Sequence, residues 1–197
     1  EVEVCWVDPK TRGKRTDESL EIVQRLLSGE TFDYSGEFFQ FEQARIIPVP
    51  DPAIPVYVGG RADAALRRAG RYADGWLGIW CSSERYAESI ELFDRAAEER
   101  DRSIEADHGI QLWVGVGEDK DEAASYVGPA MEGFYRVPFD KFARYTPHGT
   151  VDNIVDFLAP YLEAGCRHFN LTPVASSSEK GIEVIAQVGE RLRAMAD

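Results

Sequence analysis

Residues 54–83 constrain the fold of this chain most, because they read as one complete strand–helix–strand unit. The run at 54–58 is short, apolar and largely β-branched, which is typical of a strand buried on both faces of a parallel sheet. Residues 62–72 repeat apolar side chains at helical spacing, and the apolar run at 76–80 supplies a second strand. The connection between the two strands is long enough for them to pair in parallel.

The same alternation continues to the end of the chain. Further strands are predicted at 110–116 and 167–173. Helices are predicted at 84–100, capped by Ser82 or Ser83, from the N-cap Thr150, and from about residue 178. Strands that alternate with helices predict an α/β fold with a parallel sheet, and four such units are half of an eightfold barrel.

The segment before residue 54 has a different character. Thr16 is a good N-cap for a first helix. Aromatic residues flank a Ser-Gly pair within 31–41, which predicts a short hairpin. The prolines within 46–52 impose an extended connector, and we group 30–53 as a hairpin and proline-rich connector.

We predict that residues 1–197 form a single domain, which the length allows. The pair Gly128-Pro129 is expected to disturb the helix that follows the strand at 110–116. Residues 128–148 are interpreted as an insertion before the last strand–helix unit. This stretch is rich in aromatic side chains, which we interpret mainly as packing groups rather than ligand contacts.

A net charge of −13 makes the chain strongly acidic. Such a balance argues against binding to nucleic acid or to an anionic membrane surface. No apolar run approaches the roughly 18 residues of a membrane helix. Cys5, Cys81 and Cys166 are odd in number and far apart, which suits reduced thiols in a cytoplasmic protein. The three histidines lack metal-ligand spacing, so we predict no metal site.

Both strands of the 54–83 unit end in small or polar residues just before a helix begins. Gly59 and Gly60 close the first strand and have no Cβ, so the backbone there can approach a ligand closely. Cys81 and Ser82 follow the second strand at the same edge of the sheet. Backbone N–H groups at such helix starts favour an anion such as phosphate. On this pattern alone, the glycine pair is better explained by a tight strand-to-helix turn.

The remaining candidate groups have simpler interpretations. Arg61 could add positive charge to the predicted anion site or equally pair with Asp63. Asp74 is interpreted as part of a helix stop rather than as a catalytic acid. Cys81 is interpreted as a small buried residue rather than a redox thiol. Among the histidines, only His148 lies on a loop that could border a pocket. No carboxylate pair suggests acid–base chemistry.

Three stretches carry a resemblance to a known family. PVYVGGRADAALRRAGRYADGWLGIW, at 55–80, closely resembles the signature of luciferase-like monooxygenases, which are flavin- or F420-dependent oxidoreductases built on a TIM-type (β/α)8 barrel. Residues 12–50 resemble the helix after strand four of these enzymes and the connector that follows. Residues 142–173 resemble the run into their last barrel strand.

The resemblance implies that only the C-terminal half of a barrel is present. Its strands five to eight would be, in order, 54–58, 76–80, 110–116 and 168–171. Strands one to four would precede Glu1, so we expect this sequence to be a piece of a longer chain. A half barrel exposes two sheet edges, and we therefore expect a homo-oligomer or pairing with the missing half.

The resemblance also implies a function: a flavin- or F420-dependent oxidoreductase or monooxygenase acting on a small molecule, with FMN or coenzyme F420 as cofactor. This segment would hold the cofactor phosphate through Gly59, Gly60, Arg61, Trp80, Cys81 and Ser82. The catalytic residues are not identified. The alternative is a non-catalytic luciferase-like fragment that serves as a phosphate-binding or assembly module. An isomerase or aldolase is disfavoured, because no Schiff-base lysine or acid–base pair stands out.

Overall fold

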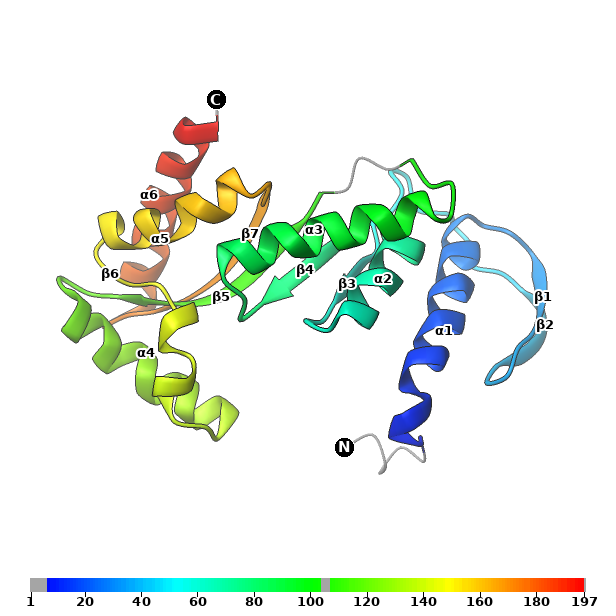
Figure 1. Ribbon diagram of the computed structural model, residues 1–197, viewed down its shortest axis with the longest axis horizontal. Coiled ribbons are helices and arrows are strands. Elements are labelled where there is room, and N and C mark those ends of the chain that lie inside the picture. Colours follow the sequence, from blue (N-terminus) through cyan, green and yellow to red (C-terminus); the bar gives the residue numbers. More distant parts are fainter. Residues whose placement is uncertain (1–6, 104–106, 197) are drawn as a thin grey trace.

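The computed structural model describes residues 7–103 and 107–196 and has a mixed α/β fold (Figure 1). Four parallel strands lie in the order β3-β4-β5-β7, which confirms the predicted parallel α/β arrangement. These strands are β3 (Tyr57–Gly59), β4 (Gly75–Ile79), β5 (Gly109–Val116) and β7 (His168–Val174).

Strand β5 is the centre of the sheet, and its two edges are used differently. Along one edge it pairs with β7 over seven residues. Along the other edge it pairs with β4 over its first three residues and with the short strand β6 (His148–Gly149) over its last two. Strand β6 therefore pairs with the end of β5 that β4 leaves unpaired.

The sheet is strongly curled. The rings of Tyr57 on β3 and His168 on β7 lie 6.0 Å apart, although β4 and β5 run between their strands. Two glycines make this approach possible. A Cβ at Gly75 would lie 2.5 Å from the Tyr57 ring, and a Cβ at Gly109 would lie 2.9 Å from Cβ of His168.

Five helices follow the strands of the parallel sheet: α2 (Asp63–Tyr72), α3 (Ser83–Glu98), α4 (Lys120–Tyr135), α5 (Val151–Glu163) and α6 (Ser178–Ala196). Two predicted N-caps are confirmed. The Ser82 hydroxyl accepts a hydrogen bond from the backbone N–H of Arg85 at the start of α3. Thr150 and Asn153 form a capping box at the start of α5, which fixes where that helix begins.

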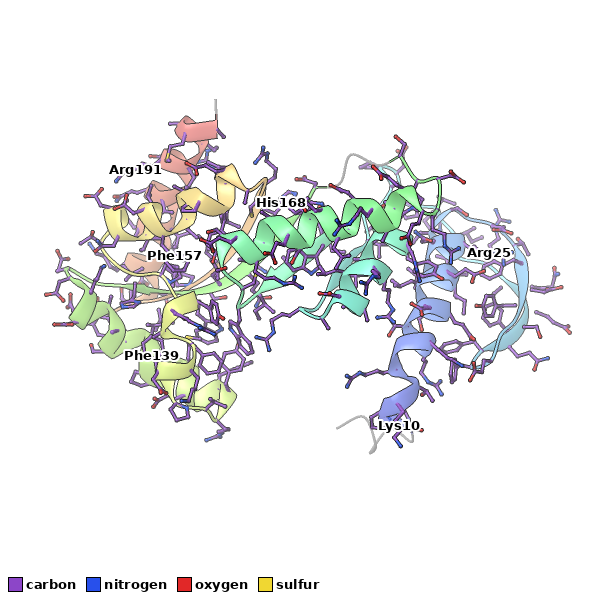
Figure 2. The ribbon with its side chains drawn as sticks, viewed as in Figure 1. Lys10, Arg25, Phe139, Phe157, His168 and Arg191 are labelled. Carbon is purple, nitrogen blue, oxygen red and sulfur yellow. The ribbon has the colours of Figure 1, made fainter. Side chains whose placement is uncertain are left out.

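The N-terminal part of the chain packs beside this α/β unit. Helix α1 (Arg12–Leu27) is followed by the antiparallel strands β1 (Phe32–Ser35) and β2 (Gln40–Ala44), so the predicted hairpin is confirmed. Lys10 lies near one end of α1, and Arg25 lies near its other end, beside the hairpin (Figure 2). The Arg25 guanidinium stacks 3.9 Å from the Phe32 ring centre.

The predicted N-cap Thr16 is wrong. It lies inside α1, where its hydroxyl donates to the carbonyl oxygen of Arg12. A 3-10 turn, η2 (Pro9–Thr11), precedes the helix, and the Asp8 side chain accepts from the backbone N–H of Lys10. The Asp-Pro pair therefore starts the helical stretch earlier, because proline is preorganised for a first helical position.

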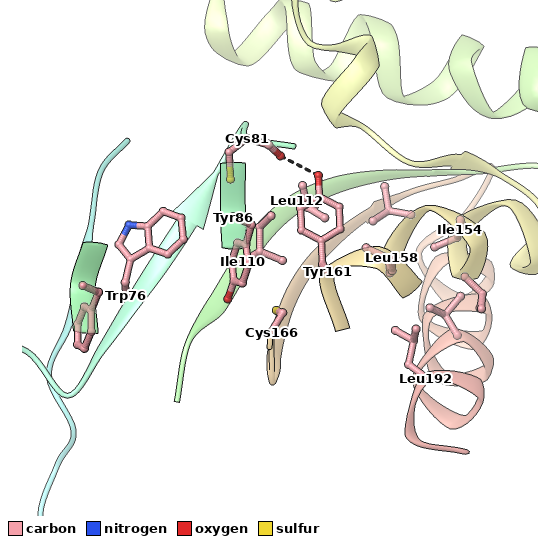
Figure 3. Close-up of a cluster of buried hydrophobic side chains, with 14 of the residues drawn as sticks. Trp76, Cys81, Tyr86, Ile110, Leu112, Ile154, Leu158, Tyr161, Cys166 and Leu192 are labelled. Atoms are coloured by element: carbon pink, nitrogen blue, oxygen red, sulfur yellow. Dashed lines mark hydrogen bonds between the residues drawn. The ribbon is translucent and has the colours of Figure 1, made fainter. Parts of the chain in front are cut away.

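The core lies on one face of the parallel sheet. On β5, Ile110, Leu112 and Val114 are fully buried, whereas Gln111 and Trp113 between them stay partly exposed. The buried side chains pack against Leu158 of α5 and other residues of α2, α3, α5 and α6 (Figure 3). The opposite face of the sheet is therefore left partly open.

Two aromatic residues join β4 to the helices. Trp76 of β4 and Tyr86 of α3 are fully buried, with ring centres 5.2 Å apart. The hydroxyl of Tyr161 in α5 donates to the carbonyl oxygen of Cys81 at 2.7 Å (Figure 3). The end of β4 is thus held by α5, a helix 80 residues further along the chain.

The strand predicted at 54–58 is shifted and less buried than expected. Strand β3 starts at Tyr57, so Pro55 lies before it, and Ile54 is 57% exposed. The reason is position: within the described residues, β3 pairs only with β4 and is an edge strand. Because one edge and one face of β3 are open, the strand is not buried on both faces as its composition predicts.

Helix α4 passes through Gly128-Pro129 and ends at Tyr135, which contradicts the predicted disturbance at this pair. Val127 and Met131 flank it and are fully buried against Phe142. A proline costs a helix interior about 3 kcal/mol. Burial of two such side chains contributes about 1.5–3 kcal/mol each, so packing outweighs the break.

The sequence predicts an apolar face on the last helix made of Ile182, Ile185, Leu192 and Met195, and this prediction is half wrong. Ile182 and Met195 are exposed on α6, whereas Val184, Val188 and Leu192 are buried in the core. The buried positions of α6 recur every four residues, at 184, 188 and 192. Hydrophobicity alone did not distinguish the two faces, because apolar residues occur on both.

No helix among the described residues is long and apolar enough to cross a membrane. The same part of the chain contains no group of three or more His, Cys, Asp or Glu side chains that could hold a metal ion.

Candidate functional site

The glycine pair forms a fixed turn between β3 and α2. Gly60 adopts φ +125°, which side chains rarely allow, and a Cβ there would lie 2.7 Å from Cβ of Ala65. The indole Nε1 of Trp76 donates to the carbonyl oxygen of Gly60 at 2.8 Å. The turn therefore requires glycine and is anchored to the core.

Two helix starts lie at the carboxyl ends of β3 and β4. Helix α2 has Ala62 as its N-cap, whose side chain cannot accept a hydrogen bond from the first turn. Helix α3 has the exposed Ser82, whose hydroxyl lies 3.3 Å from the N–H of Arg85. The first-turn N–H groups of α2 carry partial positive charge and suit an anionic ligand.

Trp80 connects β4 to this edge in an unusual conformation. Its φ of +48° lies in the left-handed region, which is uncommon for a bulky residue and costs of order 1–3 kcal/mol. The Arg61 guanidinium lies 5.4 Å from the Trp80 ring centre, within cation–π range. The strained residue thus brings the ends of β3 and β4 together.

Arg85 is a site residue that the sequence interpretation missed. Its guanidinium donates to Asp63 at 2.6 Å and lies 3.4 Å from the carbonyl oxygen of Arg61. The suggested Arg61–Asp63 pair is therefore wrong, because Arg85 holds Asp63 and lowers the pKa of that carboxyl. The signal was present in the sequence, since Arg85 lies one helical turn after the cap Ser82.

These elements line an open hollow of about 590 Å³, which we name the Ser82 hollow. Its lining residues are Arg61, Ala62, Trp80, Cys81, Ser82, Arg85 and Tyr145. Four of the six predicted site residues meet there, and Gly59 and Gly60 shape the turn beside it without lining it. Arg61 forms no salt bridge within the described part of the chain, so its charge is available to a ligand.

The Cys81 thiol is a poor candidate for reactivity. Cys81 is buried, and burial raises the pKa of its thiol to about 11. It is therefore neutral near pH 7, in line with its interpretation as a small buried residue. Burial also raises the pKa of the Cys166 thiol to about 11. Cys5 lies outside the described residues.

A second hollow of about 310 Å³ adjoins the first, and we name it the Tyr135 hollow. Its lining residues are Arg61, Trp80, Tyr135, Val137, Lys141, Phe142 and Tyr145. Several come from the end of α4 and from the 3-10 turns η3 (Phe139–Lys141) and η4 (Ala143–Tyr145). Aromatic side chains gather beside the labelled Phe139 (Figure 2). The aromatic segment thus both packs and lines a hollow.

His148 and Asp74 lie outside both hollows. His148 Nδ1 lies 2.7 Å from the carbonyl oxygen of Thr146, so this ring holds its own loop. Asp74 accepts a hydrogen bond from the backbone N–H of Val56 at 2.8 Å. Its own N–H donates to the carbonyl oxygen of Val56. Asp74 therefore fixes the chain just before β3.

His108 supports the site from the opposite end of β4. It is buried, and its Nδ1 accepts a hydrogen bond from the backbone N–H of Trp76 at 3.2 Å. Burial lowers the pKa of His108 to about 4, so the ring is neutral near pH 7. Trp76, held in this way, in turn holds the Gly60 turn.

Comparison with known proteins relates this chain to one family. Residues 2–165 match the family described as luciferase-like monooxygenase. An F420-dependent glucose-6-phosphate dehydrogenase of Nocardia farcinica is 25% identical over 218 residues, covering 97% of this chain and 64% of the dehydrogenase. An uncharacterized protein of Mycobacterium tuberculosis is 49% identical over 75 residues, 38% of this chain and 26% of that protein. The chain spans less than two thirds of these relatives.

Solved structures share the fold. An F420-dependent secondary alcohol dehydrogenase, in complex with an F420-acetone adduct, superposes with a TM-score of 0.81 at 20% identity, over 95% of this chain and 64% of that one. The monooxygenase RslO1 from Streptomyces bottropensis superposes with a TM-score of 0.79 at 17% identity, over 100% of this chain and 65% of that one. At such identities the likeness concerns the fold alone.

Proposed function

Because this chain belongs to the luciferase-like monooxygenase family, we propose that it is part of an oxidoreductase that uses FMN or coenzyme F420. The Ser82 hollow holds the phosphate of that cofactor. The observation that carries this proposal is the meeting of Arg61, Arg85 and the exposed Ser82 hydroxyl at one edge of the sheet. In a chain of net charge −13, such a concentration of cationic groups favours an anionic ligand.

The residues of the site have distinct parts in binding. Gly59 and Gly60 keep the turn free of side chains, so the phosphate reaches the backbone. Arg61 supplies a charge that no salt bridge among the described residues neutralises, and Ser82 offers a hydroxyl donor. Arg85 is already neutralised in part by Asp63 and therefore positions the two helix starts more than it adds net charge.

The bound cofactor supplies hydride transfer, and a flavin also supplies reaction with oxygen. The chain binds and orients it towards a small-molecule substrate. Both FMN and F420 fit this proposal, because the names of the relatives include an F420-dependent dehydrogenase and a monooxygenase.

The finer architecture is also a proposal. We infer that β3, β4, β5 and β7 are strands five to eight of a (β/α)8 barrel, with 30–53 as hairpin and connector and 128–148 as an insertion. The curled sheet supports this, since the Tyr57 and His168 rings meet across two intervening strands. The outer edges of β3 and β7 have no partner among the described strands, which supports pairing with a second copy or with the other strands of a barrel.

Titration of the 197-residue chain with FMN and with F420, followed by cofactor fluorescence, tests the function. We expect binding of one cofactor and a clear loss in Arg61→Gln. Arg95→Gln removes the same charge from an exposed position on α3, away from the hollow, and should leave binding unchanged. Binding with turnover supports the enzyme, and binding without turnover supports the non-catalytic module. Failure to bind either cofactor would overturn the phosphate site.

A further inference from the structure

The Tyr135 hollow has a wall of aromatic rings that contact one another. The ring centre of Trp80 lies 4.8 Å from that of Tyr135 and 4.8 Å from that of Phe142, and the Tyr135 and Phe142 centres are 5.2 Å apart. The Tyr135 hydroxyl accepts a hydrogen bond from Trp113 Nε1 at 3.0 Å. The rings are therefore already ordered, so a planar or apolar molecule can pack on them at little entropic cost.

Two cationic side chains, Arg61 and Lys141, complete the lining, and none of the lining residues is acidic. This composition contrasts with the acidic chain as a whole. Lys141 does pair with Asp140, at 3.2 Å, but the two side chains are 66% and 67% exposed. Pairs so exposed are worth little, so a ligand anion can replace Asp140 as the partner of Lys141.

The size of the hollow sets the class of ligand. A volume of about 310 Å³ is at the lower end of the range for small-molecule sites. The Ser82 hollow shares Arg61, Trp80 and Tyr145 with it, so two ligands bound side by side would be in contact. The phosphate group of a cofactor needs neither Tyr135 nor Lys141.

We propose that the Tyr135 hollow binds a small molecule with a planar or apolar body and a carboxylate-like anionic group, and that Lys141 selects for the anion. As an assignment of the substrate class, this inference rests on the proposed function. As a binding site, it stands on the aromatic wall and the two cations alone. The body of the ligand packs on Trp80 and Tyr135, and its anion faces Lys141.

Calorimetric titration of the 197-residue chain with 2-naphthoate and with the neutral 2-naphthalenemethanol tests this proposal. We expect 2-naphthoate to bind on the order of tenfold more tightly, as one charge-assisted contact allows. Lys141→Gln should bring the two affinities together by weakening only 2-naphthoate. Lys120→Gln, at an exposed lysine of α4 outside the hollow, should leave the preference intact.

A second variant and a second ligand keep the outcomes distinct. Tyr135→Leu should weaken both naphthalene compounds, because it removes part of the aromatic wall. Equal affinities in the parent chain, or a preference unchanged in Lys141→Gln, would overturn the proposal. FMN and F420 are titrated in parallel. Naphthoate binding without cofactor binding refutes the proposed function and keeps the anion site, whereas cofactor binding without anion preference refutes only the site.

Discussion

The two hollows share three residues but are built by different means. The Ser82 hollow is made by backbone turns at the ends of β3 and β4, and its residues all lie within 59–85 except Tyr145. The Tyr135 hollow is made by side chains that a helix end and two 3-10 turns bring against Trp80. The first depends on φ angles that only a few residues adopt, and the second depends on packing. Their responses to substitution should therefore differ.

The largest expected effect is that of Phe142→Ala, which removes a ring from the wall of the Tyr135 hollow. Phe142 is 7% exposed and packs with Val127 and Met131. Its truncation should lower the free energy of unfolding by about 3–5 kcal/mol and abolish naphthoate binding. Cofactor binding at the Ser82 hollow should survive in the molecules that remain folded. Chemical denaturation measures the loss.

Phe134→Ala provides the matched control on the same segment. Phe134 is 70% exposed, so its removal should change stability by less than about 0.5 kcal/mol. Equal losses in the two variants would show that the aromatic segment is not packed as the structure describes.

Acidification should act next most strongly, through His108, which holds Trp76 at the end of β4 opposite the Ser82 hollow. The ordinary histidine pKa is about 6.5, and burial lowers that of His108 to about 4. Between these two pH values, His108 of the unfolded chain binds a proton, whereas His108 of the folded chain stays neutral. Stability from this group is complete above pH 6.5 and is lost as the pH falls towards 4, by about 3 kcal/mol in total.

Denaturation midpoints measured between pH 7 and pH 4 test this expectation. His108→Asn keeps a side-chain acceptor for Trp76 but cannot titrate, so its stability should fall less steeply with pH. His168→Asn alters an exposed ring beside Asp107 and serves as the control. A slope that is unchanged in His108→Asn would show that other groups cause the acid sensitivity.

The same contrast explains what the sequence could predict. Strand order, the hairpin, the Ser82 and Thr150 caps and four lining residues of the Ser82 hollow follow from local patterns, because β/α units place strand ends and helix starts together. The Tyr135 hollow was not predicted, because it requires tertiary contacts between Trp80 and a segment more than 50 residues away. The helix through Pro129 and the buried face of α6 were mispredicted for the same reason, since packing decided them.

Gly60→Ala tests the Ser82 hollow, and its expected effect on stability is smaller than the two above. A Cβ at φ +125°, 2.7 Å from Cβ of Ala65, should cost on the order of 2 kcal/mol and weaken cofactor binding. Gly133→Ala is the control: it lies within α4, where an added Cβ has nothing within 4 Å. There, alanine should stabilise the chain by about 0.5–1 kcal/mol. A Gly60→Ala variant as stable as the parent would contradict the turn.

The smallest expected changes in ligand affinity come from the most selective pair of variants, each of which removes one indole hydrogen bond from one hollow. Trp76→Phe loses the bond from Nε1 to the Gly60 carbonyl, and Trp113→Phe loses the bond from Nε1 to the Tyr135 hydroxyl. Each bond contributes about 1 kcal/mol, with some added cost for the lost ring volume. If the two hollows are independent, Trp76→Phe should weaken the cofactor by several-fold and spare 2-naphthoate. Trp113→Phe should do the reverse. The measurement is titration of both ligands in both variants. A change in both affinities in either variant would mean that Trp80, which the hollows share, transmits the disturbance between them.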